Sequence, residues 1–351
     1  MATSKFIAPN ISFSDRLQKE EEFFSKPFLL SYSGLNRLLY SPALFYNHYV
    51  LGQRDDVEDR NMIEGKLIHC LLLNPENFDK EFVLSAQDIP SDNPRQLLQT
   101  LFNHYKELKQ HNPEDVREDL HEFSGAIVDI LSDMNLYQSL KTDAQRLDKI
   151  ITEKHVSYWE YLKASQNRTI IDHDTYNFAK SVVENIKNTP AVIDVMGFFE
   201  DPLRGIIKQN EVELVKFSDD HPFGLRGFID NLVIDPSTKT IKVNDLKKSS
   251  KNISSFKDSI EYYRYYLQAA MYYKLVEHVY LSRPEYKNFK IVFRFVVVDP
   301  YMQIAPIRVS DEKMQEWLNI LDEMLAQAVH HFQTKDFELP YEFLINSEVV
   351  L

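Results

Sequence analysis

Glycine and cysteine are both scarce in this sequence of 351 residues, and each scarcity excludes a class of site. None of the 8 glycines falls in the spacing Gly-x-x-x-x-Gly-Lys-Ser/Thr, which cradles nucleotide phosphates. We therefore expect no nucleotide cofactor and no nucleotide-driven motor or kinase. The single cysteine, Cys70, excludes an internal disulfide and any zinc or iron–sulfur site built from several cysteines.

Long apolar runs are also lacking. The sequence has no run of about 18 apolar residues that would cross a membrane, and residues 1–26 lack the apolar core of a signal peptide. Hydrophobic residues make up 44% and charged residues 26% of the chain, which is typical of a folded soluble protein. We expect a cytoplasmic protein with no membrane partner.

Positive charge is in deficit. The formal net charge is -13, which argues against a broadly basic surface for nucleic acid. The distribution qualifies this sum, because residues 242–257 carry five lysines and one aspartate. Taken alone, this lysine-rich stretch is more typical of a solvated loop than of a phosphate-binding surface.

The pattern of apolar residues changes near residue 205. Before it, three-to-four residue periodicity predicts helices; after it, β-branched and alternating residues predict strands, two of them joined by a hairpin turn at 235–238. We predict an α/β (α+β) fold with a mixed central sheet flanked by helices. The predicted parts are an N-terminal arm (1–28), a mainly helical part (29–200) and a core sheet with flanking helices (201–351), the last two forming one integrated domain. Two short helices are predicted near the start, one with Ser33 as N-cap and one after Ser41-Pro42. Further helices are predicted over residues 60–74, 95–110, 175–190, about 256–280 and about 311–333. The predicted strands are residues 210–217, 225–235, 240–247 and 290–299.

Asp245 and Lys247 are two residues apart on a predicted strand, so their side chains point to the same face. A carboxylate there can bind Mg²⁺ or Mn²⁺, and a lysine can orient water and offset charge during phosphodiester hydrolysis. An acidic residue two positions before a lysine also occurs at four other places, so this pattern by itself does not identify a site. Asp230, on the preceding strand, is costly among apolar residues unless it is paired or binds a metal. A buried salt bridge, to Arg226 or a lysine, is the alternative for Asp230.

Two predicted helices add polar groups. Gln268 and Tyr272 share a helix face with Arg264, and this row can face a phosphate, although a polar rim on an amphipathic helix is the commoner meaning. His69 lies on a predicted apolar helix, where a lone histidine is more often a hydrogen-bonded core residue. A neutral imidazole nevertheless also binds metals. The apolar core stripe of the helix that carries Gln268 and Tyr272 is formed by Leu267, Ala270, Met271 and Leu275.

In chain order these motifs resemble the RecB-like branch of the PD-(D/E)xK nucleases, and within it the RecE (exonuclease VIII) nuclease domain and its phage relatives. The family pattern is Gly-x-x-x-His on a helix, Gly-x-x-Asp and Asp-x-Lys on successive strands, and Gln-x-x-x-Tyr on the next helix. The matching segments are Gly65–His69, Gly227–Asp230, Asp245–Lys247 and Gln268–Tyr272. The opening Leu30-Ser31-Tyr32-Ser33 and the strand from Phe293 to Asp299 extend the resemblance to about residues 28–340.

The resemblance implies a metal-dependent DNA exonuclease that digests linear double-stranded DNA from its ends, 5′ to 3′, in phage-type recombination or DNA processing. It implies one or two Mg²⁺ or Mn²⁺ ions, a single-strand annealing protein as partner, and the cytoplasm of a bacterium or a phage-infected host. Ring-shaped homo-oligomers occur among relatives. The alternative, motivated by the net charge, is a catalytically silent nuclease-like module that binds DNA or a protein.

The resemblance also implies site residues. The catalytic set is Lys247, which handles the nucleophilic water, with Asp230, Asp245, Gln268 and Tyr272. The metal ligands are His69, Asp230, Asp245, Leu246 through its carbonyl, and a glutamate on the preceding strand. Glu211 and Glu213 both qualify for that last position, and Glu211 is preferred. Many relatives hold an iron–sulfur cluster through cysteines that this chain lacks, with Ser41 in place of the first, so we expect no cluster.

Overall fold

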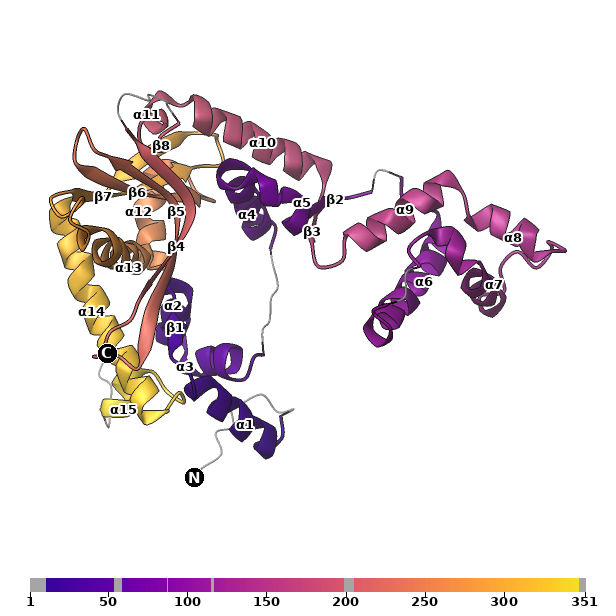
Figure 1. Ribbon diagram of the computed structural model, residues 1–351, viewed down its shortest axis with the longest axis horizontal. Helices are drawn as coiled ribbons and strands as arrows, with labels where there is room; N and C mark the ends of the chain where they lie inside the picture. The colour runs from indigo at the N-terminus through magenta and orange to yellow at the C-terminus, as the bar shows by residue number, and fades with distance from the viewer. Residues whose placement is uncertain (1–10, 54–58, 87, 115–116, 199–204, 347–351) are drawn as a thin grey trace. The chain divides into compact units, whose positions relative to one another are not determined.

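The computed structural model describes residues 11–53, 59–86, 88–114, 117–198 and 205–346. The chain forms two compact units: unit 1 comprises residues 1–74 and 180–351, and unit 2 comprises residues 75–179 (Figure 1). The segment 29–200, predicted as a mainly helical part, contributes to both units. Residues 1–10 of the predicted arm and the predicted boundary at 200 lie outside the described residues.

The centre of unit 1 is a six-stranded mixed sheet, as predicted. Its order is β1-β5-β6-β7-β8, with β4 paired to β5. The β1–β5 and β6–β7 pairs are parallel, and the β4–β5, β5–β6 and β7–β8 pairs are antiparallel. The strands are β1 (Phe28–Leu30), β4 (Ile207–Lys216), β5 (Phe223–Asp235), β6 (Thr240–Lys248), β7 (Lys290–Val298) and β8 (Ile304–Arg308).

All four predicted strands are confirmed, and the sequence patterns missed the other two strands of this sheet, β1 and β8. The three residues of β1 are too few to show a period, and β8 contains a proline, which is unfavourable in a central strand and tolerated at a sheet edge. The predicted hairpin between β5 and β6 is also confirmed. Its turn is closed by Asp235, whose Oδ1 accepts hydrogen bonds from the backbone N–H and the hydroxyl of Ser237 at 3.0 and 2.6 Å.

Helices cover the sheet of unit 1, with one further helix, α10 (His173–Asn188), crossing from unit 2 into unit 1. The unit 1 helices are α1 (Phe13–Phe24), α2 (Tyr32–Tyr40), α3 (Pro42–Phe45), α4 (Arg60–Leu73), α11 (Pro190–Ile193), α12 (Phe256–Tyr262), α13 (Tyr265–Val276), α14 (Asp311–Thr334) and α15 (Tyr341–Ile345). The predictions for α3, α4 and α14 are confirmed. No helix in the described part of the chain is both long enough and apolar enough to cross a membrane.

Two details of the predicted helices are wrong. The N-cap of α2 is Ser31, not Ser33, because the extended backbone of Ser31 lets its hydroxyl accept from the Gly34 N–H. The helix predicted over about 256–280 breaks between α12 and α13. Arg264 has φ 55°, in the left-handed region, and its side chain donates to Asn36 on α2, so a tertiary contact fixes a break that periodicity does not reveal.

The core of unit 1 lies between the sheet and α13. Figure 1 shows α13 against the sheet with α14 outside it. The predicted core stripe of α13 is confirmed, because each of its members is fully buried: Leu267, Ala270, Met271 and Leu275. α4 contacts β5 and β6, which places the His69 helix beside the two strands that carry the predicted aspartates.

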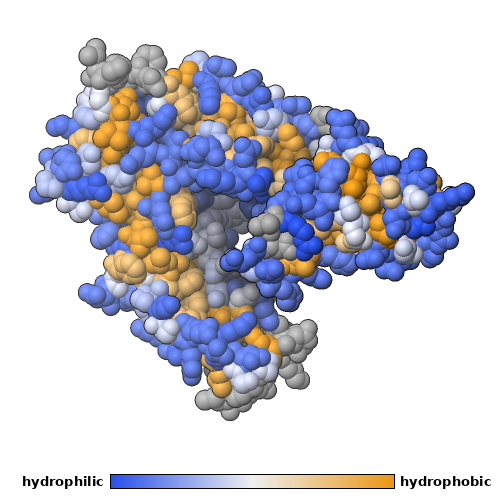
Figure 2. All heavy atoms as spheres, turned by 45° about the vertical axis from the view of Figure 1, so that its right-hand side comes forward, coloured by the Kyte–Doolittle hydropathy of each residue, from blue (hydrophilic) through white to orange (hydrophobic). Residues whose placement is uncertain are grey.

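Unit 2 has its own apolar core, centred on the fully buried Trp159. Its helices are α5 (Phe78–Glu81), α6 (Asp92–His111), α7 (Ser124–Asp133), α8 (Asp143–Ile150) and α9 (Glu153–Ala164), and it holds a parallel pair of short strands, β2 (Phe82–Leu84) and β3 (Thr169–Ile171). On the face shown in Figure 2, hydrophilic residues cover much of the surface, with hydrophobic patches between them.

Candidate active site

The candidate site begins where β5 and β6 stop pairing. The last pair of their ladder at this end is Asn231 with Asn244, so the next residues in the same register are Asp230 and Asp245. Both carboxylates are buried, at 8% and 1% exposed. The Oδ2 of Asp230 accepts the Leu246 N–H at 2.7 Å. Two acidic side chains therefore lie next to each other where the two strands separate.

Asp245 and Lys247 lie on the same face of β6, as predicted. The Lys247 Nζ is 2.6 Å from the Asp245 Oδ2 and 4.7 Å from the centre of the Tyr265 ring. Burial raises the pKa of Asp245 to about 6, with Lys247 opposing and Asp230 reinforcing the rise. Burial by itself lowers the pKa of Lys247, but the carboxylates of Asp245 and Asp230 outweigh it, so this pKa is raised. The pairing with Asp245 thus keeps Lys247 positively charged near the end of β6.

α13 supplies the amide and hydroxyl that support Asp245. The Gln268 Nε2 donates to the Asp245 Oδ1 and to the Tyr272 hydroxyl oxygen, both at 3.0 Å. The Gln268 Oε1 is buried and has no hydrogen-bond donor among the described residues. Burial raises the pKa of Tyr272 well above its usual value, so the hydroxyl stays protonated. Arg264, predicted in the same row, does not join it, since its side chain bonds to Asn36.

Gly227 allows α13 to approach this closely. A Cβ at Gly227 would lie 2.8 Å from both the Tyr272 ring and a Leu275 methyl carbon, closer than real contacts allow. The glycine three residues before Asp230 therefore has a steric function. It lets the tyrosine of the Gln-x-x-x-Tyr motif pack directly on β5.

His69 reaches the site from α4. Its Nδ1 is 3.6 Å from the Asp230 Oδ2, and its Nε2 is 3.0 Å from the Leu246 carbonyl oxygen. Because a carbonyl only accepts, the contact at Nε2 is donated by the ring, and Nδ1 is the ring nitrogen on the side of Asp230.

The structure also distinguishes between the two candidate glutamates. Glu211 lies between two residues of β4 that pair with the residues on either side of Asp230, and its φ is 50°, in the left-handed region. One ligand atom each from His69, Glu211 and Asp230 lies within 4.8 Å of the others, a spacing that suits a metal ion. Glu213 instead pairs with Arg226 at 2.7 Å. An unfavourable backbone conformation in a strand is typical of functional positions, and the sequence pattern gave no sign of it.

The site also contains residues that the sequence patterns did not predict. Tyr265 packs its ring against the Lys247 ammonium. Lys248 pairs with Glu64 on α4 at 2.5 Å and so ties α4 to β6. Asp245 is not in the group of His69, Glu211 and Asp230, since its Oδ2 faces Lys247.

One comparison with known proteins identifies a family. The family model described as "PD-(D/E)XK nuclease superfamily" matches residues 29–339. The comparison with curated proteins gave no match. Among solved structures, one from Eubacterium rectale named "Putative exonuclease" aligns over 98% of this chain and 94% of that chain, with 14% sequence identity and a TM-score of 0.45.

Proposed function

This chain belongs to the PD-(D/E)XK nuclease superfamily, and on that premise we propose that it is a divalent-metal-dependent DNA exonuclease that hydrolyses phosphodiester bonds. The observation that supports this most is the meeting of Asp230, Asp245 and Lys247 where β5 and β6 separate. A half-buried lysine held beside two carboxylates fits catalysis on a phosphate better than a structural ion pair, because a single carboxylate partner is enough for a structural ion pair.

The residues present fit a divalent cation. His69, Glu211 and Asp230 would hold Mg²⁺ or Mn²⁺, with Asp245 and the Leu246 carbonyl beside them, and carboxylate-rich sets of this kind suit hard cations. The raised pKa of Asp245 also indicates a carboxylate that gains from added positive charge. A bound ion supplies Lewis acidity and lowers the pKa of coordinated water.

The protein's own groups position the reaction. The Lys247 ammonium, held between Asp245 and the Tyr265 ring, orients the attacking water and offsets charge on the phosphate oxygens. Gln268 fixes the orientation of Asp245, and Tyr272 fixes Gln268. Burial of these groups excludes bulk water and strengthens each electrostatic contact.

The finer assignment rests on the resemblance of the ordered motifs to RecE-type enzymes. It comprises digestion of linear double-stranded DNA from its ends, in the 5′-to-3′ direction, and a place in phage-type recombination with a single-strand annealing protein. It also includes a cytoplasmic location and a ring-shaped oligomer that would make the digestion processive.

The test is a time course with Mg²⁺ on end-labelled linear duplex and on closed circular DNA. We expect the linear duplex to be shortened progressively and the circle to survive. Lys247→Ala should reduce the rate by about 10²-fold or more, as for loss of a group that stabilises charge in the transition state. Lys257→Ala, an exposed lysine on α12, is the matched control and should leave the rate unchanged.

Equal rates for wild type and Lys247→Ala would contradict the assignment of the active site. DNA binding without cleavage under Mg²⁺ or Mn²⁺ would favour the silent binding module. Cleavage of the circle would indicate an endonuclease.

A further inference from the structure

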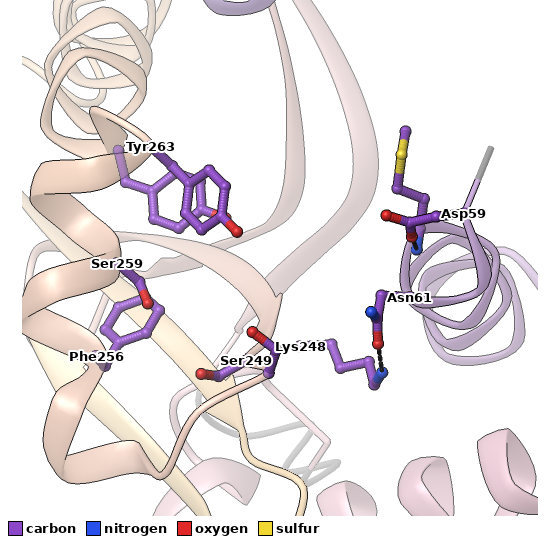
Figure 3. Close-up of a pocket in the computed structure, with 10 residues that line it drawn as sticks. Asp59, Asn61, Lys248, Ser249, Phe256, Ser259 and Tyr263 are labelled. Atoms are coloured by element: carbon purple, nitrogen blue, oxygen red, sulfur yellow. Dashed lines mark hydrogen bonds between the residues drawn. The ribbon is translucent and has the colours of Figure 1, made fainter. Parts of the chain in front are cut away.

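A cavity of about 370 Å³ opens beside the candidate active site (Figure 3). That volume lies within the usual range for sites that enclose a small molecule or a single residue of a polymer. Its walls come from the start of α4, the end of β6 and the segment from α12 to α13. The lining residues that matter here are Asn61, Lys248, Ser249, Ser259, Tyr263 and Tyr265.

The cavity shares a wall with the site. Tyr265 lines the cavity, and the Lys247 ammonium lies over its ring. Lys248, the next residue on β6, also lines the cavity. A group bound there is therefore adjacent to a phosphodiester held at Lys247.

The walls combine aromatic faces with hydrogen-bonding groups. The Tyr263 side chain is 45% exposed, and its ring is stacked on that of Tyr265, with centroids 5.3 Å apart and an interplanar angle of 25°. Ser249 and Ser259 present side chains to the cavity (Figure 3). An exposed aromatic face with nearby hydroxyls matches a flat polar ring such as a nucleobase.

The charged groups of the walls favour a base over a free phosphate. Lys248 is paired with Glu64 and also donates to the Asn61 Oδ1 at 3.2 Å. The Asp59 carboxylate caps α4 by accepting the Met62 N–H. Because both charged lining side chains already have partners within the protein, the cavity offers no strong anion site.

The face of α4 between the cavity and His69 is open. Asn61, Gly65 and His69 are spaced four residues apart, so they share one helix face over about 12 Å. A Cβ at Gly65 would meet nothing within 4 Å, although glycine inside a helix costs up to about 1 kcal/mol. Gly65 thus leaves space that the protein itself does not fill, on the path from the metal-binding group to the cavity.

We propose that this cavity receives an unpaired base of the strand being cut, next to the scissile phosphodiester, and that Tyr263 stacks on that base. The proposal rests on the proposed nuclease function and names the form of its substrate: a strand end whose bases are unstacked from the duplex. Enzymes that act on a nucleotide commonly take it out of its stack in this way.

The test uses a short single-stranded DNA that carries the fluorescent base 2-aminopurine near its end. Binding is measured in EDTA and again with Ca²⁺, with a gel confirming that the DNA stays intact. Stacking on Tyr263 should quench the fluorescence. Tyr263→Ala should bind about tenfold more weakly and lose the quenching, and Tyr263→Phe should restore both. Tyr40→Ala is the matched control, since Tyr40 is 73% exposed and does not line the cavity.

Gly65→Leu provides a second, independent variant. It should weaken binding of the same DNA, because the leucine would occupy the open face of α4. Gly125→Leu is its control, a substitution at a helical glycine of unit 2 whose Cβ also meets nothing within 4 Å. Circular dichroism checks that both variants fold.

The outcomes separate this proposal from the proposed function. If wild type shows no quenching in EDTA or Ca²⁺, or if the Tyr263→Ala and Tyr40→Ala variants behave alike, the cavity is not a base site. Cleavage of linear duplex by wild type with Mg²⁺ would then leave the nuclease assignment standing. Quenching that depends on Tyr263 without any cleavage would support the cavity and contradict the nuclease.

Discussion

Glu211 and Glu213 are two residues apart on β4, yet their side chains have different partners. The unfavourable backbone of Glu211 directs it to His69 and Asp230, whereas Glu213 neutralises Arg226. We expect Glu211→Gln to weaken Mn²⁺ binding by about tenfold or more in calorimetry, since a charged ligand is lost. Glu213→Gln should bind Mn²⁺ as wild type does. If Glu213→Gln weakened Mn²⁺ binding and Glu211→Gln did not, the metal would lie elsewhere.

The pKa of Asp245, raised to about 6, predicts how metal binding depends on pH. Above this value the carboxylate is ionised and attracts a cation; below it a proton must first be displaced. Mn²⁺ affinity should therefore fall by up to about tenfold per pH unit below 6. Because Lys247 favours the ionised form, Lys247→Ala should move the midpoint to higher pH. An affinity that is unchanged between pH 5 and pH 7.5 would contradict the expectation.

At the scale of elements, two glycines of the recognised motifs have opposite surroundings. At Gly227 a Cβ would collide with Tyr272 and Leu275, whereas at Gly65 it would meet open space. Gly227→Ala should therefore lower the free energy of unfolding by about 1–3 kcal/mol and reduce nuclease activity, because α13 must shift. Gly65→Ala should raise the free energy of unfolding by up to about 1 kcal/mol. Denaturant unfolding measures both, and similar changes in the two variants would contradict these contacts.

Elements with strong local patterns were predictable from the sequence, and those fixed by tertiary contacts were not. The strands that carry Asp230 and Asp245 are rich in β-branched and apolar residues, so their positions were predicted, as was the shared face of Asp245 and Lys247. The break at Arg264 depends on a bond to Asn36, more than 200 residues away in the chain. The choice between Glu211 and Glu213 depends on one φ angle, and alternation alone places both on the same face.

At the scale of the whole molecule, each unit contains one of the two tryptophans: Trp317 in unit 1 and Trp159 in unit 2, both buried. Each tryptophan therefore reports on one core. In a Trp159→Phe variant, Mn²⁺ at about 100 times its Kd should stabilise the transition seen by Trp317 by about 2.7 kcal/mol. In a Trp317→Phe variant, the transition seen by Trp159 should not shift. Equal shifts in both would mean that the units unfold together.

The candidate site is assembled from residues that are far apart in the chain. His69 precedes all of unit 2, and Gln268 and Tyr272 follow it by about 90 residues. During synthesis on the ribosome, a chain that has reached the end of unit 2 carries the histidine but neither strand aspartate nor the lysine. Hydrolytic capacity must therefore arise late, after α13 has been made and docked on the sheet. A copy that ends before α13 would lack Gln268 and Tyr272 and could not assemble the candidate site.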